Sequence, residues 1–155
     1  MKKTFCFVLG SVLTLIFCSA TAGASEKQIT YDDLPAAVQK TAQRETNGAT
    51  VRRYSKEVEN GKVEYEVEMI VAGKSKDISI DLSGKVVEIE QQVSLDAVPV
   101  AALAAIRKGA AGGSIRKIEQ VSSNSEIAYE AQILSNGQHR EIRVHADGSA
   151  APEQN

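Results

Sequence analysis

The side chains with the most chemical potential in this chain are acidic residues that alternate with apolar ones along three predicted strands. Alternation turns every second side chain of a strand to the same face of a sheet, so we expect these carboxylates to share one face. Like charges on one face repel each other unless lysine or arginine residues lie beside them. The seven candidates are Glu64, Glu66, Glu68, Asp77, Asp81, Glu88 and Glu90.

Three interpretations of this acidic face stay open. It can be a solvated surface, a docking face for a basic partner, or a weak site for a divalent cation. Carboxylates on one face of an extended strand lie about 7 Å apart, which is poor geometry for a tight calcium site. We therefore predict no resident metal and no cofactor, and we rank cation binding below docking.

Two histidines, His139 and His145, are candidates for metal binding or acid-base chemistry. They share a face of one predicted strand, but their α-carbons are about 20 Å apart at about 3.3 Å per residue, too far for one metal ion. The chain after residue 24 has no zinc-protease, phosphate-loop, dinucleotide-binding or serine-hydrolase motif. A Ser-His-Asp triad assembled by the fold stays open, but we expect a protein that is not an enzyme.

The first 24 residues have the pattern of a secretory signal peptide. Two lysines precede an apolar run, Phe5 to Phe17, that is too short to span a bilayer, and small residues precede Ser25. We predict cleavage before Ser25 and a periplasmic or secreted protein. A lipoprotein anchored at Cys18 is the alternative, but Phe17 stands where processing requires a small residue.

Removal of residues 1–24 takes away both cysteines and two lysines, so 16 basic residues then face 20 acidic ones, a net charge of −4. Disulfide bonds and cysteine ligands are excluded for the mature chain. The mild acidity indicates neither a nucleic-acid-binding protein nor one that binds anionic membranes. No other segment is apolar over enough residues to predict membrane insertion.

The elements that must position these residues recur at a constant spacing of 64. Ile29–Lys85 aligns with Val93–Ser149 without a gap, and eleven of the 57 positions are identical, including turn glycines, a helix-start proline and a strand tyrosine. We infer a duplicated module, with a first repeat at 25–92 and a second at 93–149. A repeat of about 60 residues is marginal alone, so we expect the two to pack together.

Each repeat is predicted to contain one helix followed by antiparallel strands. Asp32 and Asp96 are the predicted helix caps, each followed three residues later by a proline that suits a first helical turn. The predicted fold class is α+β: two tandem repeats, each with one helix packed on a three- to four-stranded antiparallel sheet. We expect Leu82 and Ile127 to point inward. We also expect the second repeat to lack a fourth strand and residues 150–155 to form a frayed tail.

These features resemble a known family. The helix, a glycine-containing break, a V-x-Y-E-V run at Val63–Val67 and a D-x-x-G-K-V run at Asp81–Val86 resemble the PepSY-like domain. The resemblance covers nearly all of the chain after the predicted signal, twice. The tandem form is similar to the arrangement in beta-lactamase inhibitory protein, whose two helix-plus-sheet repeats present a concave sheet surface to a partner enzyme.

The resemblance implies a binding module of the cell envelope or the secreted fraction, and related domains in thermolysin-type peptidase propeptides suggest modulation of a peptidase. This chain has no attached peptidase, and it lacks the cysteines and the aromatic-rich surface of the beta-lactamase inhibitor, so inhibition of that enzyme is not carried over. We predict a non-enzymatic binding protein whose partner is another envelope or secreted protein, and which acts as an inhibitor or modulator of a peptidase or other enzyme. The alternative is a module that responds to a small ligand or divalent cation through its acidic face.

Overall fold

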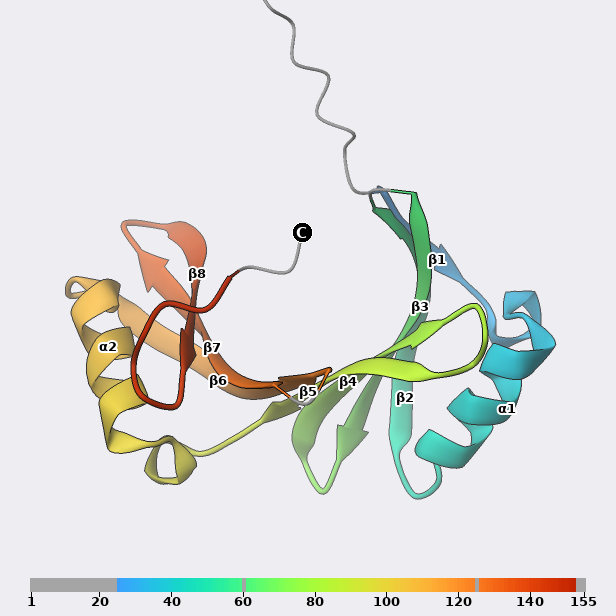
Figure 1. Cartoon of the computed structure of the whole chain (residues 1–155), viewed down its shortest axis with the longest axis horizontal. Coiled ribbons are helices and arrows are strands. Elements are labelled where there is room, and N and C mark those ends of the chain that lie inside the picture. Colours follow the sequence, from blue (N-terminus) through green and yellow to red (C-terminus); the bar gives the residue numbers. More distant parts are fainter. Residues whose placement is uncertain (1–24, 60, 125, 153–155) are drawn as a thin grey trace, which may run out of the picture.

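The computed structural model describes residues 25–152 of the 155-residue chain, apart from Asn60 and Ser125. The described residues form one antiparallel sheet of eight strands, with two α-helices packed on one of its faces (Figure 1). The predicted signal peptide lies outside the described residues. The elements in chain order are β1 (Ser25–Ile29), the 3-10 turn η1 (Tyr31–Asp33), α1 (Ala36–Glu45), β2 (Thr50–Glu59), β3 (Lys62–Val71), β4 (Lys74–Asp81), β5 (Val86–Gln92), the 3-10 turn η2 (Leu95–Ala97), α2 (Val100–Ala110), β6 (Ser114–Ser123), β7 (Glu126–Ser135) and β8 (Gln138–His145).

The eight strands lie side by side in chain order, and every neighbouring pair is antiparallel. The helix α1 connects β1 to β2, and α2 connects β5 to β6. The elements η1, α1, β2, β3 and β4 each begin 64 residues before η2, α2, β6, β7 and β8. The predicted α+β class with antiparallel strands is therefore confirmed.

The predicted count of three to four strands for each sheet is wrong. The strand β5 pairs with β4 on one side and with β6 on the other, so both halves of the chain share a single sheet of eight. The edge strand β1, which pairs with β2, was not predicted, because its sequence SEKQI is polar and mostly exposed and carries no apolar alternation. In the second half of the chain, β5 takes the place that β1 has in the first.

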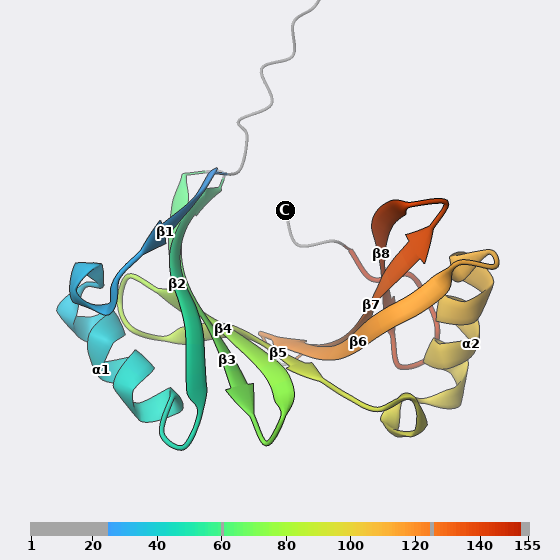
Figure 2. The ribbon, with the colours of Figure 1, turned by 180° about the vertical axis from the view of Figure 1, so that it is seen from behind.

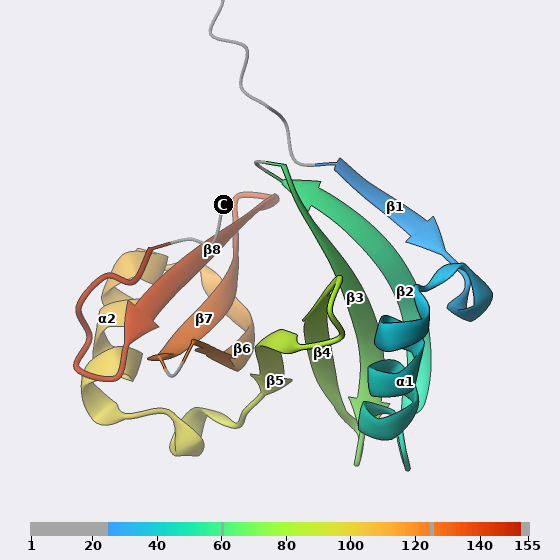
Figure 3. The same cartoon turned by 45° about the vertical axis from the view of Figure 1, so that its right-hand side comes forward.

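The sheet is strongly curved, and both helices lie on its convex side, one at each end (Figures 1 and 3). The view from behind shows the two helices at opposite ends of this side (Figure 2). The apolar side chains between each helix and the sheet form two separate cores. In the first core Val38 of α1 is fully buried with Val67 and Ile80 of the sheet, and in the second Ile106 of α2 is fully buried with Ile133. Burial of each such side chain contributes about 1.5–3 kcal/mol. We call the opposite, concave side, whose side chains alternate with those of the two cores, the helix-free face.

Both helices begin after a proline. Pro35 and Pro99 occupy the N-cap positions of α1 and α2, where a missing backbone N–H costs nothing. Asp32 and Asp96 lie instead in the 3-10 turns that precede these prolines. The prediction that the two aspartates cap the α-helices is therefore wrong, because each aspartate belongs to a 3-10 turn that ends before the proline at the N-cap.

Leu82 and Ile127 are 56% and 49% exposed, so the prediction that they point inward is wrong. Leu82 follows the last residue of β4, and Ile127 is the second residue of β7. Neither side chain belongs to the two helix-covered cores.

The chain beyond β8 is tied to the sheet. The strand expected to be missing is reduced to a single bridge between Val144 and Ala150, and the amide of Ala151 donates a hydrogen bond to the carbonyl of Arg143 at 3.1 Å. The described start of the predicted frayed tail is therefore held by backbone hydrogen bonds, while residues 153–155 lie outside the described residues.

Candidate functional site

The strand register places all seven predicted carboxylates on the helix-free face. Residues that pair across adjacent strands point to the same side of a sheet. The chain of pairs runs from β3 through β4 to β5 without changing face. The pairs are Glu64 with Asp81, Glu68 with Asp77, Asp77 with Glu90, and Ser79 with both Glu66 and Glu88.

The same face continues over the rest of the sheet and gains carboxylates that the sequence did not predict. Those on β6, β7 and β8 were missed because the acidic alternation of β3 to β5 was assigned to a sheet of its own, and Glu26 was missed because its polar strand β1 was not predicted. Only the pairing of β5 with β6 joins it to the second half. The added carboxylates are Glu26, Glu57, Glu119, Glu126, Glu130 and Glu141.

Charge is divided unequally between the two sides of the molecule. Among side chains that the structure describes, thirteen carboxylates and four cations project from the strands of the helix-free face, a formal charge of −9. Residues 25–155 carry −4 in total, so all residues outside this set of seventeen, Glu59 and Glu153 included, together carry +5. A face with this excess creates a negative potential that attracts cationic groups. The four cations are Arg53, Lys62, Lys117 and Arg143.

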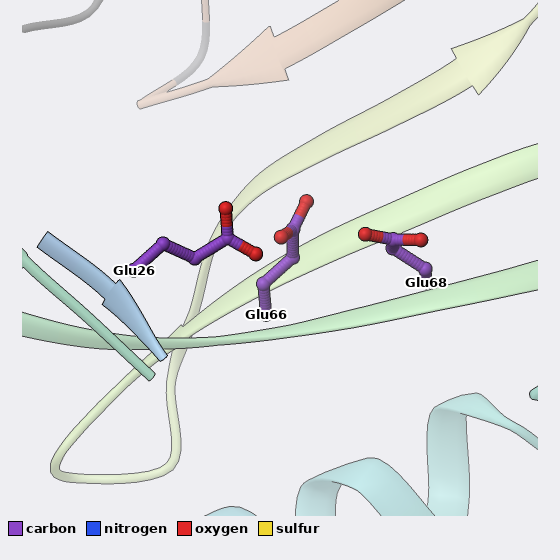
Figure 4. A group of neighbouring side chains, drawn as sticks. All are labelled: Glu26, Glu66 and Glu68. Atoms are coloured by element: carbon purple, nitrogen blue, oxygen red, sulfur yellow. The ribbon is translucent and has the colours of Figure 1, made fainter. Parts of the chain in front are cut away.

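One end of the face is organised by Arg53. Its Nη1 lies 2.7 Å from Oε1 of Glu26, and its Nε donates a hydrogen bond to Oε1 of Glu68 at 2.6 Å. Carboxylate oxygens of Glu26, Glu66 and Glu68 lie within 4.8 Å of one another (Figure 4). Three carboxylates at this spacing are a ligand set that a calcium ion prefers, but the guanidinium group already neutralises two of them.

The centre of the face, where the two halves of the sheet meet, is formed by β4, β5 and β6. Carboxylate oxygens of Asp77, Glu90 and Glu119 lie within 4.8 Å of one another. Glu119 is only 2% exposed; its Oε2 lies 2.6 Å from Nζ of Lys117, and its Oε1 accepts a hydrogen bond from Oγ of Ser75 at 3.0 Å. Three carboxylates here therefore share one nearby ammonium group.

Two carboxyl groups of this centre have raised pKa values. Burial, followed by repulsion from Glu130 and Glu88, raises the pKa of Glu90 to about 8. Burial, followed by repulsion from Glu119, raises the pKa of Asp77 to about 6. Both groups lose solvation on the crowded concave face, and this loss destabilises the charged carboxylate relative to the protonated acid.

The other end of the face is organised by Arg143, whose side chain is only 7% exposed. Its Nη2 donates a hydrogen bond to Oε2 of Glu88 at 3.1 Å, and its Nη1 lies 3.7 Å from Oε2 of Glu130. Burial raises the pKa of Glu130, Glu141 adds repulsion, and Arg143 acts against both. This buried guanidinium group therefore connects β5, β7 and β8.

Glu66 lies on the same face and accepts a hydrogen bond from a hydroxyl group. Oγ of Ser55 donates a hydrogen bond to its Oε2 at 3.1 Å, and the residue opposite it in β4 is Ser79. Burial, followed by repulsion from Glu57, raises the pKa of Glu66 to about 7.

Asp81 has a structural role at the turn after β4. Its Oδ1 accepts a hydrogen bond from Oγ of Ser83 at 2.5 Å and others from the backbone amides of Ser83 and Lys85, at 2.8 and 3.0 Å. The hydroxyl hydrogen bond first, and the amide bonds after it, lower the pKa of Asp81 below its ordinary value. Together with Glu64 and Leu82 it also lines an open hollow of about 580 Å³. Of the seven predicted residues, Asp81 is thus the one whose carboxylate is committed to holding a turn.

His139 and His145 lie on the helix-free side of β8, opposite Leu134 and Ala128 of β7. Within the described residues, neither histidine belongs to a group of three side chains that could hold a metal ion. The arrangement of this face therefore favours charge recognition by carboxylates over histidine chemistry.

Several solved structures share this architecture. A proposed periplasmic protein of Bacteroides eggerthii aligns with a TM-score of 0.62 and 16% identity, over 79% of this chain and 88% of its own. A DUF2874 family protein from Bacteroides ovatus aligns with a TM-score of 0.58 and 17% identity, over 77% and 85%. A BLIP-like protein from Bacteroides fragilis aligns with a TM-score of 0.55 and 16% identity, over 78% and 85%.

At these identities the likeness shows the fold alone, which is an α+β fold of the BLIP-like arrangement. No protein-family model matches the chain, and no curated protein matches its sequence. Neither of the helices in the described part of the chain is long and apolar enough to cross a membrane.

Proposed function

We propose that this chain is a non-enzymatic periplasmic or secreted binding protein that presents its helix-free face to another envelope or secreted protein. The observation that carries the proposal is the formal charge of −9 on a concave face that runs without interruption over eight strands. On this interpretation the chain inhibits or modulates a peptidase or another enzyme, and it is a tandem PepSY-like protein with repeats at 25–92 and 93–149.

Preorganisation supports a docking role. Arg53 and Arg143 each bridge two carboxylates that come from different strands. Side chains held in this way lose little conformational entropy when a partner binds. Complementary charge also steers a basic partner to the face and raises its association rate.

The comparisons support the cellular location and the mode of binding. One neighbour in fold is described as a proposed periplasmic protein and another as BLIP-like, and residues 1–24 have the pattern of a secretory signal. A curved sheet whose helices all lie on the convex side leaves its concave side open to a partner, as in the beta-lactamase inhibitory arrangement.

Affinity capture with charge-reversed variants tests this proposal. We expect immobilised protein to retain a basic partner from an envelope extract, and the double variant Glu64→Lys/Glu141→Lys to lose that partner. The double variant Asp32→Lys/Glu45→Lys makes the same charge change in η1 and α1, away from the helix-free face, and should retain it. If both variants capture the same proteins as the unmodified chain, the helix-free face is not the docking surface.

A module that responds to a divalent cation is the second candidate, favoured by the convergence of Asp77, Glu90 and Glu119 within 4.8 Å. Lys117 already supplies a cation to Glu119, which favours the docking proposal. Melting curves with calcium, magnesium or chelator distinguish the two candidates. A rise in melting temperature at millimolar calcium that Asp77→Asn abolishes would support the cation module, and no shift would exclude it.

A further inference from the structure

The central carboxylates of the helix-free face hold more negative charge than their own cation can balance. Asp77, Glu90 and Glu119 come from three adjacent strands, and their oxygens lie within 4.8 Å of one another. Lys117 is the cation in direct contact with this group, 2.6 Å from Glu119. With every group ionised, this centre carries a formal charge of −2.

The charged groups around the centre add to the imbalance. On β5 and β7, Glu88 and Glu130 face it, and both repel the charge on Glu90. On β8, Arg143 contacts Glu88 and Glu130. On β3, Glu68 repels the charge on Asp77, and Arg53 of β2 contacts Glu68. The two arginines are thus engaged by other carboxylates.

Lys117 shows how strongly this centre attracts positive charge. Burial alone would lower its pKa, but the hydrogen bond to Glu119 and the charges of Glu119, Asp77 and Glu90 together raise it. A second cation placed beside Asp77 and Glu90 would therefore be bound favourably.

We propose that the free protein keeps one proton on the Asp77–Glu90 pair, and that a lysine or arginine side chain of the docking partner replaces this proton. The exchange rests on the proposed function, because the helix-free face must be the docking surface. On docking, the carboxylic acid loses its proton to solvent, and the resulting carboxylate pairs with the partner's ammonium or guanidinium group. Docking on this face is thereby linked to pH.

The raised pKa values give the direction of the linkage. Glu90, with a pKa of about 8, is mainly protonated at pH 7, and Asp77, with a pKa of about 6, is mainly ionised. A cation prefers the ionised form, so the affinity for a basic partner rises with pH. For one proton released, the dissociation constant falls by about tenfold per pH unit below pH 8.

Two measurements test the inference. The first is a carbon-13 NMR titration of the carboxyl groups of the free protein, where Glu90 should titrate near pH 8. The second is calorimetry with a ten-residue lysine peptide as the probe, at pH 6, 7 and 8, in buffers of different ionisation enthalpy. The peptide is acetylated at its N-terminus, because a free α-amino group would titrate near pH 8, and its lysine side chains keep their charge over this range. We therefore expect tighter binding at pH 8 and net release of protons at pH 7.

Glutamine variants provide the matched control. Glu90→Gln retains the shape of a protonated glutamate and should remove most of the proton release at pH 7 and weaken the pH dependence of binding, leaving the smaller contributions of Glu66 and Asp77. Glu126→Gln removes an exposed carboxylate from the same face and should leave the proton release unchanged. Equal proton release from the two variants would overturn the assignment to Glu90.

The outcomes separate this inference from the proposed function. Binding of the peptide without proton release, or titration of Glu90 near pH 4, overturns the proton exchange and leaves the docking face intact. Absence of peptide binding at every pH, with Glu90 still titrating near pH 8, overturns docking of a basic partner and the exchange with it.

Discussion

At the scale of single residues, matching positions of the two halves carry different charges. Glu66 and Glu130 are identical residues 64 positions apart, and each pairs across the sheet with the next strand. The partner of Glu66 is Ser79, whereas the partner of Glu130 is Arg143. Of these two matching glutamates, Glu130 therefore has a guanidinium group opposite it and Glu66 has a hydroxyl group.

We expect Ser79→Arg to place a cation opposite Glu66, in the way that Arg143 lies opposite Glu130. The cation should lower the pKa of Glu66 from about 7 and raise the free energy of unfolding at pH 8 by about 1 kcal/mol. The gain should be smaller at pH 5, where Glu66 is protonated. Urea unfolding at both values of pH measures it, with Ser79→Met as the uncharged control; equal stability of the two variants would contradict the prediction.

Arg143→Met should be among the most destabilising substitutions on the helix-free face. It would leave Glu88 and Glu130, whose side chains are both 13% exposed, without their shared cation. Loss of one partner from a buried ion pair costs about 3 kcal/mol, and the loss should be smaller at pH 5 because burial raises the pKa of Glu130, which can then take up a proton. Arg116→Met, at an exposed position of β6, is the control and should change the free energy of unfolding by less than about 0.5 kcal/mol.

At the scale of elements, the contact between a helix and a glycine turn is formed by the same residues in both halves of the chain. Gly84 and Gly148, which follow β4 and β8, have φ near +85°, and a Cβ atom on either would lie 2.7 Å from the carbonyl oxygen of Ala37 or Ala101. All four residues are identical pairs at the spacing of 64. The identities thus mark the contact between each helix and the turn that closes its half of the sheet.

We expect Gly148→Ala to cost about 2 kcal/mol more than Gly112→Ala. Both glycines have φ of +84°, but no atom lies within 4 Å of a Cβ built on Gly112. The left-handed backbone costs both alanine variants about 1–2 kcal/mol, so the difference between them measures the close approach to α2. Equal losses in urea unfolding would show that the helix moves aside without cost.

The sequence predicted these elements well, and their partners less well. The sequences of both helices and of the strands β3 and β4 have regular apolar periodicity, which predicts these elements without any knowledge of the fold. The polar strand β1 has no such signal, because its place depends on backbone hydrogen bonds to β2. The sequence of β5 indicates a strand but not its partners. Its role as the link between the two halves depends on backbone hydrogen bonds to β4 and β6, which no local pattern predicts.

At the scale of the whole molecule, the crowded carboxylates make stability depend on pH. Folding raises the pKa of Glu66, Asp77 and Glu90 above the values of about 4 found in unfolded chains. The folded protein therefore binds protons that the unfolded chain has already lost. The contribution is fully present near pH 4 and is lost as pH rises through 6 to 8.

We expect the free energy of unfolding to be about 2 kcal/mol higher at pH 5.5 than at pH 9, allowing for partial solvent screening of these groups. Below pH 4 stability should fall again, because Asp33, Asp81, Asp96 and Asp147 have pKa values lowered by hydrogen bonds that require the ionised form. Urea unfolding at constant ionic strength, from below pH 4 to pH 9, measures both changes in the free energy of unfolding. Greater stability at pH 9 than at pH 5.5 would contradict the prediction.

By itself, the sequence determined that this chain contains two similar sets of elements, an α+β fold with antiparallel strands, and acidic residues on one face of β3 to β5. These properties follow from local periodicity, turn residues and the spacing of 64. The tertiary structure alone decided that β5 joins both halves into one curved sheet, so that Glu90 meets Glu119 and Arg143 reaches Glu88. Pairing between distant strands and the burial of charge depend on the packed whole, and no local pattern encodes either of them.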